Sequence, residues 1–131
     1  MIKIGIIAEY TATYEPHVVT SRAIEHSSEE LGLAVSYEWI STVDVKEDFF
    51  DVYDGLWVAP GSPYKSMDKA LWAIREGPIA ITGSDAEGEV RVVEYPEHPL
   101  FFATLFVPQM LSQPNKPHLL VTAFLRAVSR A

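Results

Sequence analysis

Residues that could bind a ligand stand directly after two predicted strands. Glu9 and Tyr10 follow the apolar run "KIGIIA", while Gly61, Ser62 and Tyr64 lie in "PGSPY" after the run "LWVA". Parallel strands of α/β proteins usually form a ligand crevice at their carboxyl ends. We therefore expect these five residues to line a site for a small molecule, although loop packing alone would also explain Glu9 and Tyr10.

The turn "PGSP" suggests a particular chemistry for the second of these loops. Gly61 can adopt a positive φ, and such turns can direct backbone N–H groups toward an anion or a developing oxyanion. Ser62 would be a nucleophile only beside a base, and no base lies near it in the sequence. A tight loop with a purely geometric role explains the turn equally well.

A third predicted strand, 101–106, ends without an acid, a base or a nucleophile, because Val107, Pro108 and Gln109 follow it. The sequence contains no cysteine, which excludes disulfides, thiolate zinc sites and cysteine nucleophiles. The histidines lack the spacing of metal ligands and are His17, His26, His98 and His118. We expect neither a metal nor a cofactor.

The composition indicates one acidic domain with a substantial core. The 131 residues are 48% hydrophobic and carry a formal net charge of −8, so we predict a single domain over residues 1–131. This charge repels phosphate backbones and anionic lipid, which makes nucleic acid and membranes poor partners. No apolar run approaches the roughly 18 residues of a membrane span, and "MIKIGIIAEY" lacks the features of a signal peptide. We expect a cytoplasmic location.

Strands and helices are predicted to alternate along the chain. Apolar and β-branched runs predict strands at 3–9, 34–40, 56–59, 78–82, 90–95 and 101–106. Helical spacing predicts helices at 17–33, 66–77 and 117–128, with Pro16 in a first turn, Ser66 as a cap and Gly32 as a stop. This order favours an α/β sandwich with a mostly parallel sheet, in which a hairpin-like stretch precedes the last helix.

Three stretches resemble the class I glutamine amidotransferase domain, most closely the glutaminase half of CTP synthase. "IKIGIIAEYTATYEPHVV" is similar to the family's first strand, its "GKY"-type loop and the following helix. "DGLWVAPGSP" is similar to the strand that ends in the oxyanion-side Pro-Gly turn, and "EHPLFFATLFVPQMLSQPNKPHLL" is similar to the family's carboxyl end. The resemblance implies a flavodoxin-like three-layer sandwich and a place in pyrimidine nucleotide metabolism.

The chain departs from this family at the catalytic residues. Val107 and Gln109 stand where the family has the histidine and glutamate of a His-Pro-Glu motif, and neither can move a proton or hold an imidazole as an acid does. The strand-to-helix turn that carries the family's nucleophilic cysteine is also absent. Compared with the family, a block of roughly 80 to 100 residues is missing here, which is the size of a small domain. Either the domain is shortened, with Ser84 near the former turn, or the parent protein has a segment that this sequence lacks. We favour shortening, because a nucleophile strand is normally central in its sheet.

The resemblance and these departures leave two main functional hypotheses. The first is a binding or assembly module without glutaminase activity, which keeps a small-molecule crevice or forms a homodimer through apolar surface near 76–81. The second is a part of a CTP synthase-like amidotransferase that handles glutamine-derived ammonia, with its nucleophile outside this sequence. A hydrolase that uses Ser62 or Ser84 is a weaker third hypothesis, since neither serine has a basic partner near it in the sequence.

Overall fold

The structure, a computed structural model, describes residues 1–59, 64–75, 80–84, 86–87, 90–94, 102–104 and 107–130. Its centre is a parallel sheet of order β2-β1-β3. The strands are β1 (Ile2–Ile7), β2 (Val35–Ile40) and β3 (Gly55–Val58). Each was predicted within two residues of its observed position.

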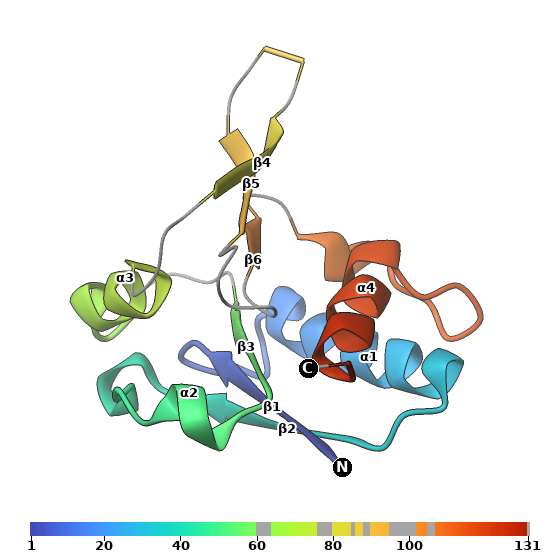
Figure 1. Ribbon diagram of the computed structural model, residues 1–131, viewed down its shortest axis with the longest axis horizontal. Helices are drawn as coiled ribbons and strands as arrows, with labels where there is room; N and C mark the ends of the chain where they lie inside the picture. Colours follow the sequence, from blue (N-terminus) through green and yellow to red (C-terminus); the bar gives the residue numbers. More distant parts are fainter. Residues whose placement is uncertain are drawn as a thin grey trace.

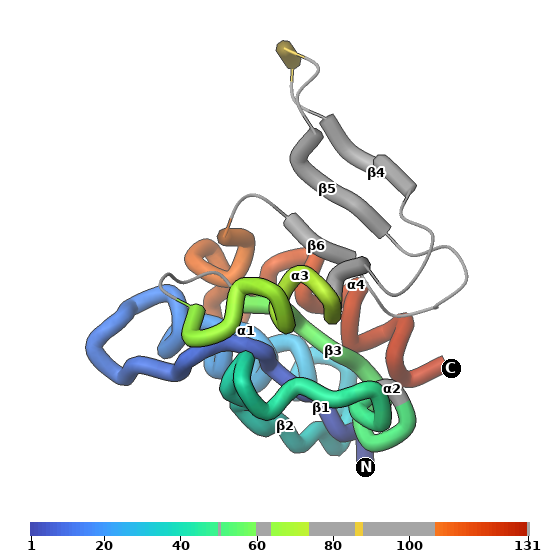
Figure 2. The backbone as a smooth tube through the Cα atoms, turned by 90° about the vertical axis from the view of Figure 1, so that its left-hand side faces the viewer, coloured from blue at the N-terminus to red at the C-terminus, as the bar shows by residue number. Residues whose placement is uncertain are grey.

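Helices cover both faces of this sheet. Helices α1 (Glu15–Leu31) and α4 (Leu119–Val128) lie on one face, and α2 (Phe49–Val52) and α3 (Met67–Arg75) lie on the other (Figure 1). Figure 2 shows α2 and α3 in front of the sheet. The predicted three-layer α/β fold is confirmed, although the short helix α2 was not predicted. No described helix is both long and apolar enough to span a membrane.

Strand β1 is buried on both faces because it is the central strand of the parallel sheet. Ile4 and Ile6 are fully buried and pack in one cluster with Ile24 of α1 and Leu125 of α4. Ile7 belongs to a second cluster on the opposite face, which includes a residue of α3. Alternate side chains of a strand point to opposite faces, so a continuous apolar run supplies both clusters.

Strand β3 approaches α4 closely at Gly55. A Cβ atom at this position would lie 2.8 Å from Val128 Cγ2 and 3.1 Å from Phe124 Cζ, both of α4. These distances are shorter than ordinary van der Waals contact, so the absence of a side chain lets the helix pack directly on the strand. Gly55 therefore determines how close the α4 layer lies to the sheet.

The predicted helix boundaries agree with the observed caps. Gly32 ends α1 in the left-handed conformation, with a φ of 62°, and its N–H donates to Glu29 O at 3.1 Å. Ser66 Oγ accepts a hydrogen bond from Lys69 N at 3.3 Å and so caps the first turn of α3. Helix α4 begins two residues later than predicted, because His118 caps it through Nδ1, which accepts from Leu120 N at 3.2 Å.

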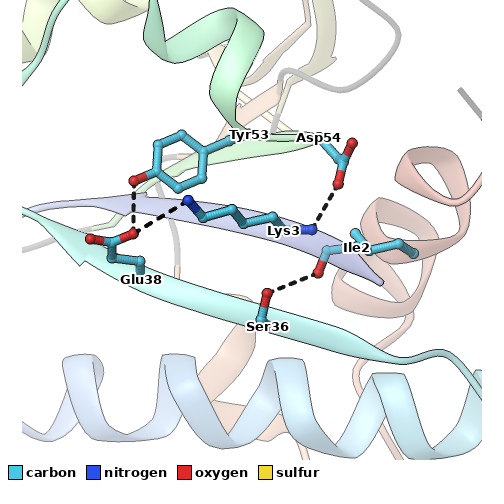
Figure 3. Close-up of polar contacts among 6 residues, drawn as sticks. All are labelled: Ile2, Lys3, Ser36, Glu38, Tyr53 and Asp54. Carbon is cyan, nitrogen blue, oxygen red and sulfur yellow. Dashed lines mark hydrogen bonds and ion pairs between the residues drawn. The ribbon is translucent and has the colours of Figure 1, made fainter.

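A polar cluster crosses the sheet from β2 to the segment before β3 (Figure 3). Glu38 Oε2 lies 3.7 Å from Lys3 Nζ and accepts a hydrogen bond from Tyr53 OH at 3.0 Å. Lys3 N donates to Asp54 Oδ2 at 2.8 Å. Burial raises the pKa of Tyr53, and its hydrogen bond to Glu38 raises it further, to about 12. Tyr53 is thus a neutral donor that helps to join the strands.

The remaining described strands form a second, antiparallel sheet of order β4-β5-β6. They are β4 (Ala80–Ser84), β5 (Val90–Glu94) and β6 (Phe102–Thr104). The connection 85–89 is too short for the crossover that a parallel pair requires, so β4 pairs antiparallel with β5. The sheet of the α/β sandwich is therefore parallel over β1, β2 and β3, and β4 is not hydrogen-bonded to β3.

Candidate functional site

Glu9 joins the segments that follow all three parallel strands. It lies two residues after β1, and its Oε1 accepts hydrogen bonds from Ser41 Oγ at 2.8 Å, Thr42 N at 2.9 Å and Thr42 Oγ1 at 2.7 Å. Thr42 Oγ1 in turn accepts from Ser66 N at 2.9 Å. Ser41 and Thr42 follow β2, and Ser66 lies between β3 and α3. The carboxyl ends of the strands are therefore tied together by one carboxylate.

Hydrogen bonding keeps the Glu9 carboxylate charged. Burial raises its pKa, but the hydrogen bonds from Thr42, Ser41 and the backbone of Lys65 together outweigh burial, so the pKa lies below its ordinary value. The second oxygen, Oε2, is buried and has no hydrogen-bond partner among the described residues. A buried acceptor without a partner is unusual in proteins. Oε2 is thus a buried acceptor at the strand ends, and the backbone N–H of Lys65 lies near enough to this carboxylate to lower its pKa.

An aromatic cluster lies beside Glu9, built around Tyr10. The Tyr10 side chain is 48% exposed, and its ring centroid lies 4.9 Å from that of Trp39 and 6.0 Å from that of His17. His17 is buried, its ring lies 4.8 Å from that of Tyr14, and its Nδ1 accepts from Thr11 N at 3.0 Å. The buried rings hold Tyr10 as part of an aromatic surface that a planar or cationic ligand can contact.

Sequence reasoning assigned no site role to His17 or Trp39. His17 was considered only for metal-ligand spacing, and Trp39 was placed only within the predicted strand 34–40. The available signal was a pair of tyrosines after β1, Tyr10 and Tyr14. The second of them lies three residues before His17, at the start of a helix. That pair gives no indication of Trp39, which reaches the cluster from β2.

Tyr64 lies near Glu9 but is engaged within the protein. Its hydroxyl donates to Ala59 O at 2.7 Å, which closes the loop that follows β3. Burial raises the pKa of Tyr64, and the nearby charge of Glu9 raises it further. Of the five predicted ligand residues, Glu9, Tyr10 and Tyr64 are thus described, whereas Gly61 and Ser62 lie outside the described residues.

Gln109 is buried and joins the 3-10 helix η2 (Pro108–Leu111) to α1. Its side chain is 1% exposed, and its Nε2 donates to Thr20 Oγ1 at 3.0 Å. Thr20 Oγ1 itself donates to Pro16 O at 2.7 Å, so its single proton is already used. The Thr20 hydroxyl therefore accepts from an amide at position 109, and a carboxylate could not replace that donor.

Val107, directly before η2, is 36% exposed. Its side chain can neither accept nor donate a proton. Ser84 ends β4, where its backbone pairs with Val90. Among the described residues, no group of three or more His, Asp or Glu side chains is arranged to hold a metal ion; His98 lies outside them.

The arrangement at the strand ends is suited to binding. The described residues there offer a charged carboxylate with one unpartnered oxygen and a partly exposed aromatic surface. Groups of these kinds are chemically suited to a small ligand with a donor or cationic group beside a planar or apolar part.

The sequence is similar to segments of CTP synthases. It is 46% identical over 48 residues to CTP synthase of Trichormus variabilis, and 43% identical over 51 residues to CTP synthase of Synechocystis sp.. The matched segments cover 36% and 38% of this chain but only 9% of each relative. No family model matches the sequence.

The fold is similar to a solved glutaminase domain. The structure of the Trypanosoma brucei CTPS glutaminase domain with bound acivicin aligns with a TM-score of 0.78. The alignment covers 99% of this chain and 94% of that chain, at 11% sequence identity. The two proteins therefore share their fold, and the sequence similarity to CTP synthases comes from the shorter matched segments.

We predict that Glu9→Gln lowers the free energy of unfolding at pH 7 by about 1 to 3 kcal/mol, because donors from Ser41 and Thr42 lose their charged acceptor. The lowered pKa of Glu9 means that the ionised carboxylate stabilises the fold above the unfolded-state pKa. This stabilisation is lost as the pH falls through the folded-state pKa. Urea denaturation at pH 7 and at lower pH should therefore show the difference between wild type and variant shrinking in acid.

The matched control for this variant is Glu47→Gln. Glu47 is exposed and has no hydrogen bond or ion pair in the described part of the chain, so we expect its substitution to change stability little. Equal stability of the two variants, or a Glu9→Gln effect that is the same at both pH values, would contradict the assigned role of Glu9.

We predict that Gln109→Glu destabilises the protein at pH 7 by about 2 to 5 kcal/mol, because it removes the donor to Thr20 and buries a charge. Acidification should reverse part of the loss, since a protonated carboxyl group can donate to Thr20 Oγ1. Chemical denaturation over a pH series measures both effects.

Gln113→Glu, an exposed change on the same segment, is the control and should have little effect on stability. A Gln109→Glu variant as stable as wild type at pH 7 would refute the assigned hydrogen-bond direction.

Proposed function

We propose that this chain, a glutamine amidotransferase-like domain related to CTP synthase, is a binding or assembly module without glutaminase chemistry. The observation that carries the proposal is the pair Val107 and Gln109. The resemblance aligns these residues with the histidine and glutamate of the family's His-Pro-Glu motif. Here one is an exposed aliphatic side chain, and the other is a buried amide whose donor is engaged by Thr20.

The loss of these groups removes steps that covalent acyl transfer requires. A glutaminase of this class needs a nucleophile, a base to take its proton and a group that orients the base. This sequence contains no cysteine, and Val107 cannot serve as the base. Removing members of such a set typically costs several orders of magnitude in rate. We place the module in the cytoplasm, which agrees with a cysteine-free composition.

Ligand binding is supported by the strand ends that the module retains. Glu9 presents a buried oxygen without a partner among the described residues, and Tyr10 presents a partly exposed ring held by its neighbours. We propose a small molecule with a donor or cationic group as the ligand of this crevice. The loop with Gly61 and Ser62 would complete the site.

We also propose that the module forms a homodimer. The expected interface near 76–81 falls largely outside the described side chains, but two large apolar side chains elsewhere in the described structure are exposed. Leu111 of η2 is 73% exposed and Leu119, at the start of α4, is 82% exposed. A hydrogen bond from His118 N to Ser112 Oγ, at 3.3 Å, brings these segments together. Burial against a second copy is the commonest way for a protein to cover such a surface.

The alternative is that the chain acts within a CTP synthase-like amidotransferase that handles glutamine-derived ammonia. The observation that favours it is the 46% identity to a CTP synthase over a segment that is only 9% of that relative. In this case a nucleophile segment outside the sequence would supply the chemistry.

We predict that the purified 14.6 kDa chain releases no ammonia from glutamine above the uncatalysed rate. Intact mass of the protein purified from its native source should be measured beside the assay. A mass well above 14.6 kDa with activity would favour the alternative. Turnover at an ordinary rate by the 131-residue chain, abolished by Ser62→Ala or Ser84→Ala, would replace the module with a hydrolase.

We predict a dimer in sedimentation equilibrium at micromolar concentration. Leu111→Ser should weaken self-association by about tenfold, because it removes an apolar side chain from the proposed interface. Val52→Ser is the control, since Val52 is a 47% exposed apolar residue of α2 and should not contribute. A monomer at micromolar concentration would refute the dimer, and equal effects of the two variants would place the interface elsewhere.

A further inference from the structure

A cleft of about 490 Å³ lies between α1 and the segment that follows η2. Arg22, Glu25 and His26 line it from α1, and Ser112, Gln113 and Pro114 line it from the opposite side. Its volume is within the range of small-molecule sites. None of the strand-end residues described above lines this cleft, so it is a separate feature of the fold.

Ser112 holds the imidazole ring of His26 through its Nδ1 atom. Ser112 Oγ accepts from His118 N at 3.3 Å, so its own proton can be donated to His26 Nδ1, 3.2 Å away. With Ser112 as the donor, the imidazole carries its proton on Nε2. Nε2 has no partner among the described residues. His26 is therefore a half-buried donor whose ring is held by the opposite wall of the cleft.

Arg22 supplies a second donor group on the same face of α1. It lies one helical turn before His26, and neighbours at this spacing project from the same side of a helix. Within the described part of the chain, Arg22 makes no hydrogen bond and no ion pair. The acidic residue of the cleft, Glu25, accepts a hydrogen bond from Tyr37 OH at 2.7 Å and does not pair with Arg22.

The wall opposite α1 is held in place by backbone hydrogen bonds. Gln113 N donates to Lys116 O at 3.2 Å, and Lys116 N donates to Gln113 O at 3.1 Å, which closes a tight turn around Pro114. Ser112 N donates to Gln109 O at 3.1 Å and so connects the wall to η2. The cleft is thus formed before any ligand arrives, which lowers the entropic cost of binding.

We propose that Arg22 and His26 bind a small organic anion with a carboxylate or phosphate group in this cleft, while Ser112 orients His26. The planar guanidinium group matches the paired oxygens of these anions, and the His26 Nε2–H adds a second donor. Glu25 and the net charge of −8 oppose the anion, so the ligand must be recognised by these specific hydrogen bonds. This site is separate from the strand-end crevice, and it borders the proposed dimer surface, because Ser112 directly follows Leu111.

Titration followed by amide NMR tests the proposal, with inorganic phosphate and succinate as separate probes at constant ionic strength. We expect saturable shifts of the Ser112, Gln113 and His26 signals with at least one probe, and the probe that binds identifies the anionic group. Arg22→Gln should weaken binding by about tenfold or more, as expected for one charge-assisted hydrogen bond. Arg126→Gln, an exposed change of the same charge on α4, should leave binding unchanged.

Three results would overturn this site. One is the absence of saturable shifts with both probes. Another is equal weakening by Arg22→Gln and Arg126→Gln, which would indicate a general charge effect. The last is a set of shifts centred on residues outside the cleft. Because Arg22 is exposed and has no partner in the described structure, its substitution should not impair folding, and circular dichroism checks this.

Discussion

The ionised carboxylate of Glu9 is the interaction on which the strand-end site depends. One oxygen receives three hydrogen bonds from Ser41 and Thr42, and Thr42 passes the connection on to Ser66. Three loops that are distant in sequence therefore take their positions from a single charged group. Under the proposed function, the group that organises the site is also the group that would contact the ligand.

Residues 107 and 109 are only two positions apart, but the fold uses them differently. The side chain of Val107 is partly exposed to solvent. Gln109 is built into the protein, because it connects η2 to α1 through Thr20. The proposal that this strand end carries no acid–base chemistry is therefore supported more strongly by Gln109, whose amide has a structural role.

Local signals in the sequence predicted the parallel part of the fold and the helix ends. The run "KIGIIA" indicated a strand buried on both faces, and Gly32 and Ser66 marked a helix stop and a cap that the structure shows. Such local signals could not predict hydrogen bonds between residues that lie far apart in the sequence. The bond between Thr20 and Gln109 joins residues 89 positions apart, and that between His26 and Ser112 joins residues 86 apart. Glu9 was predicted from the sequence to bind a ligand, but its hydrogen-bond partners after β2 and β3 could be found only from the fold.

The direction of the hydrogen bond at Thr20 links the side chains that positions 20 and 109 can hold. Because the Thr20 hydroxyl gives its proton to Pro16 O, it can only accept from residue 109, and an amide satisfies it where a carboxylate does not. Glutamate at position 109 alone would therefore place a charge against an acceptor. It would fit only with a different residue at position 20 or with the Thr20 hydroxyl freed from Pro16 O. The two positions are thus coupled, and a change at one constrains which substitutions the other tolerates.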